Sequence, residues 1–377
     1  MRVMAAFGTR PEAIKMAPVI EELLRWREQF QLRVCTTAQH RHMLAPVKRL
    51  FRFPVHYDLN VMRPDQRLGQ LTAHILEGIP AVLKQARPDV VLVQGDTTTT
   101  LAVSLAAFYE RIPVAHIEAG LRTYDPSAPY PEEVNRRLTT QLADYHFAPT
   151  HRARQNILNE GIPANRVFVT GNTVIDAFLR ARLLVLRRPP RVPGLNGLAQ
   201  TKRKLILVTA HRRENFGPGL EGICEALRRL ALTREDIEIV YPVHPNPNVR
   251  TTVDRHLSNL PHLHLIEPLD YLPFVWLITK TYLVLTDSGG LQEEMPSLGR
   301  PVLVLREKTE RPEGIEAGVC QLVGTNPETI IRVTTRLLDD PQSYRRFTVP
   351  ASPFGDGAAA GRIVDHLARL LNRGQSR

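Results

Sequence analysis

Two carboxylates directly follow short apolar runs of the sequence. Asp96 comes after VVLVQG at 90–95, and Glu118 comes after PVAHI at 113–117. Both runs are typical of strands buried on both faces of a parallel sheet, and the Ala-rich pattern over 97–108 predicts a helix after the first. Open α/β sheets bind ligands outside the carboxyl ends of their strands, so Asp96 and Glu118 are candidates for proton transfer in one site. For Asp96 alone, capping of the following helix is the alternative.

Two cations follow the first predicted strand. Residues 2–7, RVMAAF, predict this strand, and GTRPEAIKMAP predicts a glycine turn and a helix that starts near Pro11. Arg10 and Lys15 would then lie near a helix N-terminus, beside the same sheet edge as Asp96 and Glu118. Cations and free backbone N–H groups suit an anion, whereas a solvated first turn is the alternative. No GxGxxG motif follows the strand, so a nicotinamide cofactor is not indicated.

A third carboxylate, Glu132, opens another predicted helix together with Glu133. Both follow Pro131, at the end of a loop rich in proline and tyrosine. Carboxylates in the first turn of a helix often do no more than interact with the helix dipole. A catalytic role for Glu132 and this dipole role therefore both remain open at the level of sequence.

The second half of the chain repeats the alternation of strands and helices. KLILVTAH at 204–211 predicts a strand that ends in His211, and IEIVYPVHPNP predicts one that ends at His244. TDSGG at 286–290 predicts a turn between a strand and a helix, where Ser288, Gly289 and Gly290 would let backbone N–H groups approach a phosphate. Glu294 lies one turn further, where it could accept hydrogen bonds from ribose hydroxyls. Together with Arg311 and His211, this favours a diphosphate site over a tight packing turn.

The length indicates two domains, and the alternation of strands and helices indicates an α/β protein, so we expect two Rossmann-like doubly wound domains. We expect domains at 1–185 and 201–355 with a proline-rich linker at 186–200, and the helix at 356–372 could pack back on the first domain. No apolar run approaches the ~18 residues of a membrane span and no signal peptide is recognisable, so we expect a soluble, cytoplasmic protein with no membrane partner. Cys35, Cys224 and Cys320 lack metal-like spacing, which favours reduced thiols over a disulfide framework or a metal site.

The net charge of +11 comes from 42 Arg and 7 Lys that are scattered along the chain. Because these residues form no basic block interleaved with aromatics, nucleic acid is the weakest partner class. The charge by itself does not decide between a small anionic ligand and an acidic membrane, and the arginine excess is also compatible with genomic base composition or heat adaptation.

Eleven motifs together make the chain resemble the non-hydrolysing UDP-N-acetylglucosamine 2-epimerases. They run from residue 8 to about 313 and are GTRPEAIKMAP, TAQHR, GDTTTTLA, HIEAGLRT, PEEVNRR, TGNTVIDA, HRREN, YPVHPNPNVR, YLPFVWL, TDSGGLQEE and TERPE. The resemblance implies a fold similar to that of GT-B glycosyltransferases, with the active site in a central cleft and the C-terminal helix crossing back to the first domain. It also implies a homodimer that needs no cofactor and no metal.

The motif matches identify which residues of this sequence correspond to functional positions of the family. The positions that match catalytic residues are Asp96, Glu118, Glu132 and His211. Those that match nucleotide-sugar contacts are Arg10, Lys15, Phe274, Ser288, Gly289, Gly290, Glu294 and Arg311. Leu269 departs from the family, since relatives can carry a glutamine there near the uracil. A backbone contact would survive this change, but a side-chain contact would not.

Some members of the family also bind a second UDP-N-acetylglucosamine as an activator. The positions that match this allosteric pocket are Gln39, His40, Gln66, Arg212 and His244. His42 and Asp65 depart from it, because some relatives have Gln and Arg there. The resemblance therefore supports the reaction more strongly than it supports allosteric activation.

The resemblance implies reversible conversion of UDP-N-acetylglucosamine to UDP-N-acetylmannosamine, which would supply sugars for cell-surface polysaccharide. The family eliminates UDP to form 2-acetamidoglucal and then adds it back, which requires an acid or base on each face of the sugar. The carboxylates could supply these groups, but the sequence does not assign them to faces. Three rivals are a hydrolysing epimerase, a GT-B glycosyltransferase and a nucleotide-sugar sensor without turnover.

Overall fold

The computed structural model describes residues 1–37, 50–63, 66–192, 201–348 and 352–374, together with residues 47, 194, 195 and 197. The chain divides into two compact units, Met1–Ala177 with Phe354–Arg377 and Phe178–Pro353. Helix α7 (Thr173–Arg187) carries the chain from the first unit into the second. Its sequence contains no Gly or Pro, and the helix accordingly continues to Arg187, two residues into the stretch expected to be a linker.

The first unit is built on a parallel sheet of seven strands among the described residues, in the order β3-β2-β1-β4-β5-β6-β7. Its strands are β1 (Arg2–Phe7), β2 (Gln31–Thr36), β3 (Tyr57–Asp58), β4 (Val90–Gln94), β5 (Val114–Ile117), β6 (Tyr145–Ala148) and β7 (Val167–Val169). Every residue of β4 and of β5 is buried, as expected for central strands of a sheet with helices on both faces.

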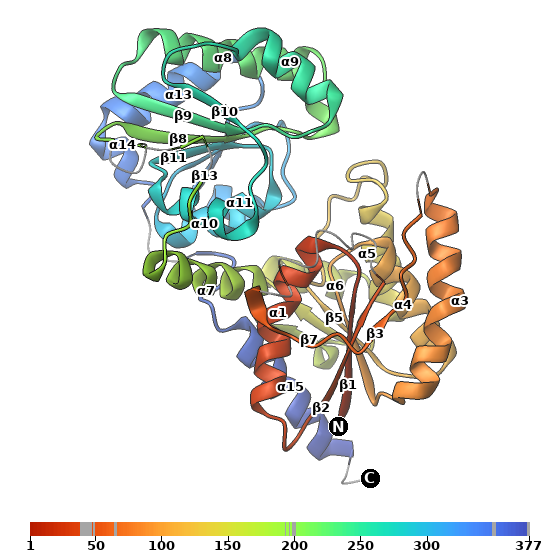
Figure 1. Ribbon diagram of the computed structural model, residues 1–377. Helices are drawn as coiled ribbons and strands as arrows, with labels where there is room; N and C mark the ends of the chain where they lie inside the picture. Colours follow the sequence, from red (N-terminus) through yellow and green to blue (C-terminus); the bar gives the residue numbers. More distant parts are fainter. Residues whose placement is uncertain are drawn as a thin grey trace. The chain divides into compact units, whose positions relative to one another are not determined.

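Helices cover both faces of this first sheet (Figure 1). Besides the start of α7 they are α1 (Arg10–Arg25), α3 (Leu68–Ala86), α4 (Thr98–Tyr109), α5 (Glu132–Leu142), α6 (His151–Asn159) and α15 (Ala359–Gly374), with the 3₁₀ turn η1 (Ala164–Arg166). Helix α15 returns from the far end of the chain to pack against α1, whereas α3, α4 and α5 pack successively against one another on the other face.

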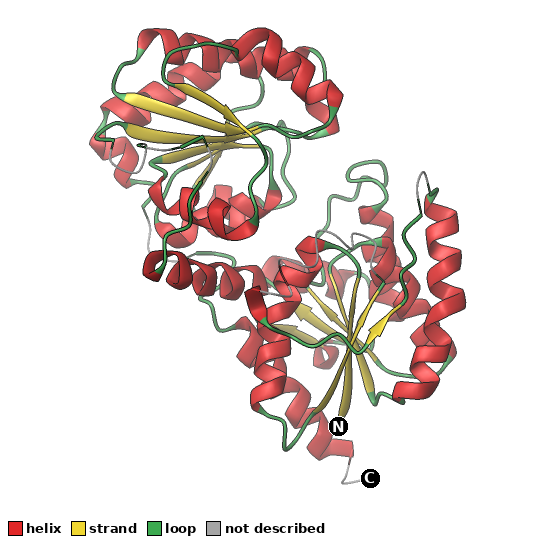
Figure 2. Cartoon of the chain, in the orientation of Figure 1, coloured by secondary structure: helices red, strands yellow, loops and turns green. Residues whose placement is uncertain are grey.

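The second unit contains a parallel six-stranded sheet in the order β10-β9-β8-β11-β12-β13 within the described part of the chain (Figure 2). Its strands are β8 (Lys204–Thr209), β9 (Ile237–Pro242), β10 (Leu263–Ile266), β11 (Leu283–Thr286), β12 (Val302–Val304) and β13 (Cys320–Leu322). Its helices are α8 (Pro218–Thr233), α9 (Pro247–Leu257), α10 (Tyr271–Lys280), α11 (Gly289–Glu294), α12 (Pro312–Glu316), α13 (Pro327–Asp339) and α14 (Pro341–Arg345), with 3₁₀ turns η3 (Arg213–Asn215) and η4 (Met295–Leu298).

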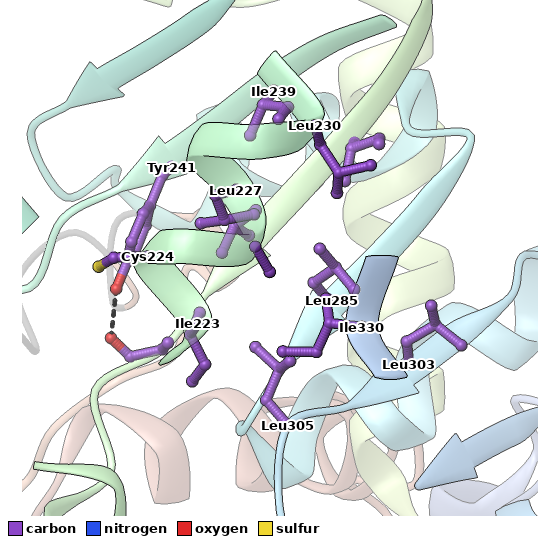
Figure 3. Close-up of a cluster of buried hydrophobic side chains, with 14 of the residues drawn as sticks. Ile223, Cys224, Leu227, Leu230, Ile239, Tyr241, Leu285, Leu303, Leu305 and Ile330 are labelled. Atoms are coloured by element: carbon purple, nitrogen blue, oxygen red, sulfur yellow. Dashed lines mark hydrogen bonds between the residues drawn. The ribbon is translucent and has the colours of Figure 1, made fainter. Parts of the chain in front are cut away.

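A large apolar core lies between the second sheet and helices α8, α9 and α13 (Figure 3). Leu227 of α8, Ile239 of β9 and Leu285 of β11 are fully buried there, and full burial of such a side chain contributes roughly 1.5–3 kcal/mol. Tyr241 carries a polar atom into this core, and its hydroxyl donates to the backbone carbonyl of Ala210 at 2.6 Å. The core thereby fixes the residue that directly precedes His211.

The strand orders confirm the prediction of two doubly wound α/β domains. In each sheet the chain first builds outward in one direction and then crosses back to build in the other. The direction changes between two adjacent strands, which are β1 and β4 in the first sheet and β8 and β11 in the second. Doubly wound proteins bind their ligands at the carboxyl ends of these strands. The segments after β1, β4, β8 and β11 contain Arg10, Asp96, His211 and the TDSGG motif.

The structure refines several predicted elements. The run LRVCTTAQ at 32–39 predicts the second strand, and the observed β2 ends at Thr36. Gly289 and Gly290 belong to the first turn of α11 rather than to the turn before it. The sequence also predicts a helix near 43–52, and that segment lies mostly outside the described residues. No described helix has the length and apolarity that a membrane span requires. The three cysteines, all within the described residues, are buried and free, and burial raises the pKa of each thiol to about 12.

Candidate active site

Glu118 directly follows β5 and is 8% exposed. Lys15 Nζ donates to both of its carboxylate oxygens, at 2.6 and 2.7 Å, and Asn172 Nδ2 donates to one of them at 2.9 Å. The side-chain amide of Gln94, the last residue of β4, donates as well. The backbone at Glu118 is left-handed, with a φ of 62°, which residues with a side chain seldom adopt and which recurs at ligand sites.

Asp96 lies in the turn between β4 and α4. The helix cap is Thr97, whose hydroxyl accepts from the Thr100 N–H at 3.2 Å, so the capping alternative for Asp96 does not hold. Asp96 instead pairs with Arg136 Nη2 of α5 at 2.7 Å, and its backbone carbonyl accepts from Asn135 Nδ2 at 3.0 Å. Its side chain is 27% exposed and thus remains open to a ligand.

Glu132 and Glu133 are neighbours with different surroundings. Glu133 is fully buried and accepts hydrogen bonds from the backbone N–H groups of Thr123 and Tyr124, both at 3.0 Å. Glu132 is the first residue of α5 and is only partly buried. Glu133 therefore anchors the loop that leads into the helix, and Glu132 is the carboxylate of the pair that a ligand can reach.

Glu12 joins the two loops that bear Arg10 and Asp96. Its fully buried carboxylate accepts from the backbone N–H groups of Gly8 and Thr9, at 3.1 and 2.7 Å, and from the hydroxyl of Thr97 at 2.7 Å. Burial raises the pKa of this carboxyl, while these hydrogen bonds oppose the rise. Arg10 is the first residue of α1 and is partly exposed, as a ligand contact requires.

His211 follows β8, and its side chain is 37% exposed. Its ring stacks on that of His244, with centroids 5.3 Å apart and planes 10° from parallel. Burial lowers the pKa of His211, the charge of Asp287 opposes this by raising it, and the neighbouring Arg212 and His244 side chains lower it further. Asp287 itself follows β11, so the two strands at the reversal of the second sheet deliver adjacent side chains.

The TDSGG segment forms the start of α11, with Ser288 as its N-terminal flanking residue. A Cβ atom on Gly289 would lie 2.4 Å from Arg311 Nη1, whereas one on Gly290 would meet no atom closer than Ser288 Oγ at 3.9 Å. Gly289 is therefore needed for packing, and Gly290 faces open space. Glu294 lies in the last turn of α11 and is 8% exposed.

Arg311 is 7% exposed and pairs with two carboxylates. It donates to Glu293 of α11 and, at 2.5 Å, to Glu310. A phosphate contact by Arg311 would thus add to an existing network of charges. Phe274 lies in α10 and is partly buried, and Leu269, which departs from the family pattern, is partly buried before the same helix.

Comparisons with known proteins agree with these motifs. The family model described as UDP-N-acetylglucosamine 2-epimerase matches residues 22–368. The chain belongs to this family. The UDP-N-acetylglucosamine 2-epimerase of Yersinia pestis is 54% identical over 97% of this chain and 98% of its own length. The crystal structure of the Neisseria meningitidis enzyme, bound to UDP-GlcNAc, has 48% identity and a TM-score of 0.93, and covers 98% of this chain and 100% of that one.

A more distant structure places the fold among the GT-B-like proteins. The glycotransferase of kitacinnamycin has a TM-score of 0.64 over 98% of both chains, at 14% identity. At this identity the likeness concerns the fold alone. The family, in contrast, is one of epimerases, which are isomerases.

The positions that match the 2-epimerase allosteric pocket are only partly described. Gln39, His40, His42 and Asp65 lie outside the described residues. Gln66 belongs to the first unit, where its Nε2 lies 2.7 Å from His74 Nδ1. Arg212 and His244 belong to the second unit, on either side of His211 in the chain.

Sequence reasoning missed several residues of this candidate site. Gln94 was counted within an apolar strand, although a polar residue at the end of a buried strand is itself a signal. Asn172, Arg136 and Asp287 lie within recognised motifs, but the carboxylates and the histidine that they contact, Glu118, Asp96 and His211, are at least 40 residues away in the chain. Such pairings follow from the strand order, which the motifs alone do not give.

Proposed function

We propose that this chain epimerises carbon 2 of UDP-N-acetylglucosamine to give UDP-N-acetylmannosamine. The UDP-GlcNAc bound to the Neisseria meningitidis relative supports the substrate, and the names of the curated relatives support the reaction class. The observation that carries the proposal is the group of acidic side chains at the switch point of the first sheet. Glu118, bound by Lys15, follows β5, and Asp96, bound by Arg136, follows the neighbouring strand β4.

The chemistry explains why carboxylates are needed. The proton on carbon 2 is not adjacent to a carbonyl, so direct abstraction is too slow. We infer that the bond from carbon 1 to the diphosphate oxygen breaks, that UDP leaves with the electron pair, and that a carboxylate removes the carbon 2 proton. A double bond forms between carbons 1 and 2, which gives 2-acetamidoglucal. A second acid then protonates carbon 2 from the opposite face, and UDP adds back to carbon 1.

The residues of the second unit suit the role of holding UDP. The N–H groups of Gly289 and Gly290 begin α11 directly after Ser288, whose own N–H donates to Thr286 Oγ1 at 2.9 Å. His211 and Arg311 can neutralise the charge that develops on the diphosphate. Glu294 and Phe274 are proposed to contact the nucleoside. In the first unit, Asp96, Glu118 and Glu132 are proposed as the acid and base groups, with Arg10 and Lys15 beside them.

Isotope exchange tests the elimination route. Turnover of UDP-N-acetylglucosamine in deuterated water, followed by mass spectrometry and proton NMR, is expected to incorporate deuterium at carbon 2 of both epimers. Epimerisation without label would contradict the elimination mechanism and point to a keto or hydride route.

The same samples separate the rival functions. A hydrolysing epimerase would accumulate free N-acetylmannosamine and UDP, whereas the proposed reaction leaves the sugar attached to UDP at equilibrium. A glycosyltransferase would consume the nucleotide sugar only when an acceptor is added, and a sensor would bind it without any turnover.

A further inference from the structure

The two carboxylate oxygens of Asp287 differ in their hydrogen bonding. The residue is fully buried, and its Oδ2 accepts from the backbone N–H groups of His211 and Arg212, at 2.7 and 2.8 Å, and from Asn215 Nδ2 at 3.2 Å. Its Oδ1 is buried as well but has no hydrogen-bond partner among the described residues. A buried carboxylate oxygen without a donor costs free energy, so its retention calls for an explanation.

The polar atom that Oδ1 approaches is His211 Nδ1, at 3.5 Å. This distance is just beyond a normal hydrogen bond, and a shift of about half an ångström would close it. The stacked ring of His244 restricts the His211 imidazole from one side. His244 cannot take the place of Asp287, because its own Nδ1 already accepts from the Asn246 N–H at 3.1 Å.

We propose that Asp287 is a positioning residue, which holds His211 in the tautomer with its proton on Nδ1 and leaves Nε2 directed away from the protein. This inference rests on the proposed role of His211 at the diphosphate. In that tautomer Nε2 can accept a proton from solvent water, because the His211 side chain is partly exposed, and Asp287 then stabilises the imidazolium that forms. The resulting cation offsets the negative charge of the departing UDP.

The two oxygens of Asp287 separate this role from a purely structural one. Oδ2 connects the loop after β8 to the end of β11 through hydrogen bonds, and this structural role needs only a hydrogen-bond acceptor. Asp287→Asn retains an acceptor for the three N–H donors and places an NH₂ group opposite His211. Because an amide NH₂ donates, it should bind unprotonated Nδ1 and shift the imidazole proton to Nε2.

The test is nitrogen-15 NMR of histidine-labelled protein, with His211 assigned by its absence from the His211→Gln spectrum. In the wild-type protein we expect the Nδ1–H tautomer at neutral pH. In Asp287→Asn we expect the Nε2–H tautomer, a lower pKa for His211, and a turnover number reduced roughly 100-fold or more. The KM for UDP-N-acetylglucosamine should change little, because the loop keeps its hydrogen bonds.

A matched control is Asp340→Asn. Asp340 also accepts from a backbone N–H, that of Gln342 at 2.8 Å, but belongs to the cap of α14. This variant should leave the His211 tautomer and the turnover number unchanged.

Two outcomes would overturn the inference. One is an Nε2–H tautomer in the wild-type protein, which is decisive even if Asp287→Asn does not fold. The other is an Asp287→Asn protein whose His211 keeps its tautomer and pKa. Failure of the proposed function has a different signature, since the wild-type protein would then not epimerise UDP-N-acetylglucosamine, whatever the spectra show.

Discussion

At the residue scale, the candidate site combines carboxylates that are fixed with carboxylates that are accessible. Glu118 is held by Lys15 and two amides, and Asp96 is held by one arginine and stays partly exposed. These donors fix the orientation of both carboxylate oxygens of Glu118. A base that removes a proton from a defined position requires such a fixed orientation. The sequence predicted both carboxylates, because each ends a recognisable apolar run. It could not predict Lys15 as the partner of Glu118, since the two are 103 residues apart.

The adjacent residues Glu132 and Glu133 provide a test at the same scale. We expect Glu132→Gln to reduce turnover by ~100-fold to 10,000-fold, as the loss of a general acid or base does, with little change in melting temperature. We expect Glu133→Gln to lower the melting temperature instead, because its buried carboxylate binds two backbone N–H groups and lies 3.5 Å from Arg136. Steady-state kinetics and thermal unfolding of both variants make the comparison. If Glu132→Gln keeps most of its activity, its role is limited to the helix dipole.

At the scale of elements, the two glycines of α11 look equivalent in the motif but have different surroundings in the structure. The sequence predicted that Ser288, Gly289 and Gly290 let backbone approach a phosphate, and it treated the two glycines alike. The structure distinguishes them, because Arg311 packs over Gly289 and leaves Gly290 open. Arg311 comes from a segment beyond β12, so only the folded arrangement of β11 and β12 reveals this contact. Arg311→Ala would accordingly cost stability, because it removes a buried ion pair with Glu293, whose side chain is 1% exposed.

The two glycines should therefore respond differently to substitution. Gly290→Val is expected to weaken UDP binding, measured by calorimetry, while the melting temperature stays nearly unchanged, because its side chain extends into open space. Gly289→Ala is expected to lower the melting temperature, since overpacking costs about 1–3 kcal/mol and outweighs a helix-propensity gain of up to about 1 kcal/mol. Equal UDP affinity in Gly290→Val and wild type would place the diphosphate elsewhere.

At the scale of the whole molecule, the last helix of the chain, α15, belongs to the first unit. Asp176 of α7 accepts from the backbone N–H groups of Ala359 and Ala360, the latter at 2.9 Å, and so caps the start of α15. The sequence predicted a helix at 356–372 that could pack back on the first domain, and α15 does pack against α1. The capping contact spans more than 180 residues and involves an aspartate in a helix, where no local pattern marks it.

This contact predicts a pH dependence of folding stability. Burial raises the pKa of the Asp176 carboxyl from 3.8 to about 6, against the opposing effect of the two N–H groups, and the charge of Asp356 adds to the rise. The folded state therefore binds more protons at Asp176 than the unfolded state does between about pH 4 and 6. The contribution of Asp176 to the free energy of unfolding is therefore largest below pH 4 and is lost as the pH rises through 6. The loss amounts to at most about 3 kcal/mol, since one pKa unit corresponds to ~1.4 kcal/mol.

Urea unfolding of wild type and Asp176→Asn at pH 4.5 and pH 7 measures this contribution. The neutral amide does not titrate, so the stability advantage of wild type over the variant should be larger at pH 4.5 than at pH 7. Asp236→Asn is the control, because hydrogen bonds from Arg234 hold the pKa of Asp236 below its usual value and its contribution to stability changes little over this range. An advantage of wild type that instead grows from pH 4.5 to pH 7 would mean that the N–H groups at the start of α15 outweigh burial, and that Asp176 caps the helix as an anion.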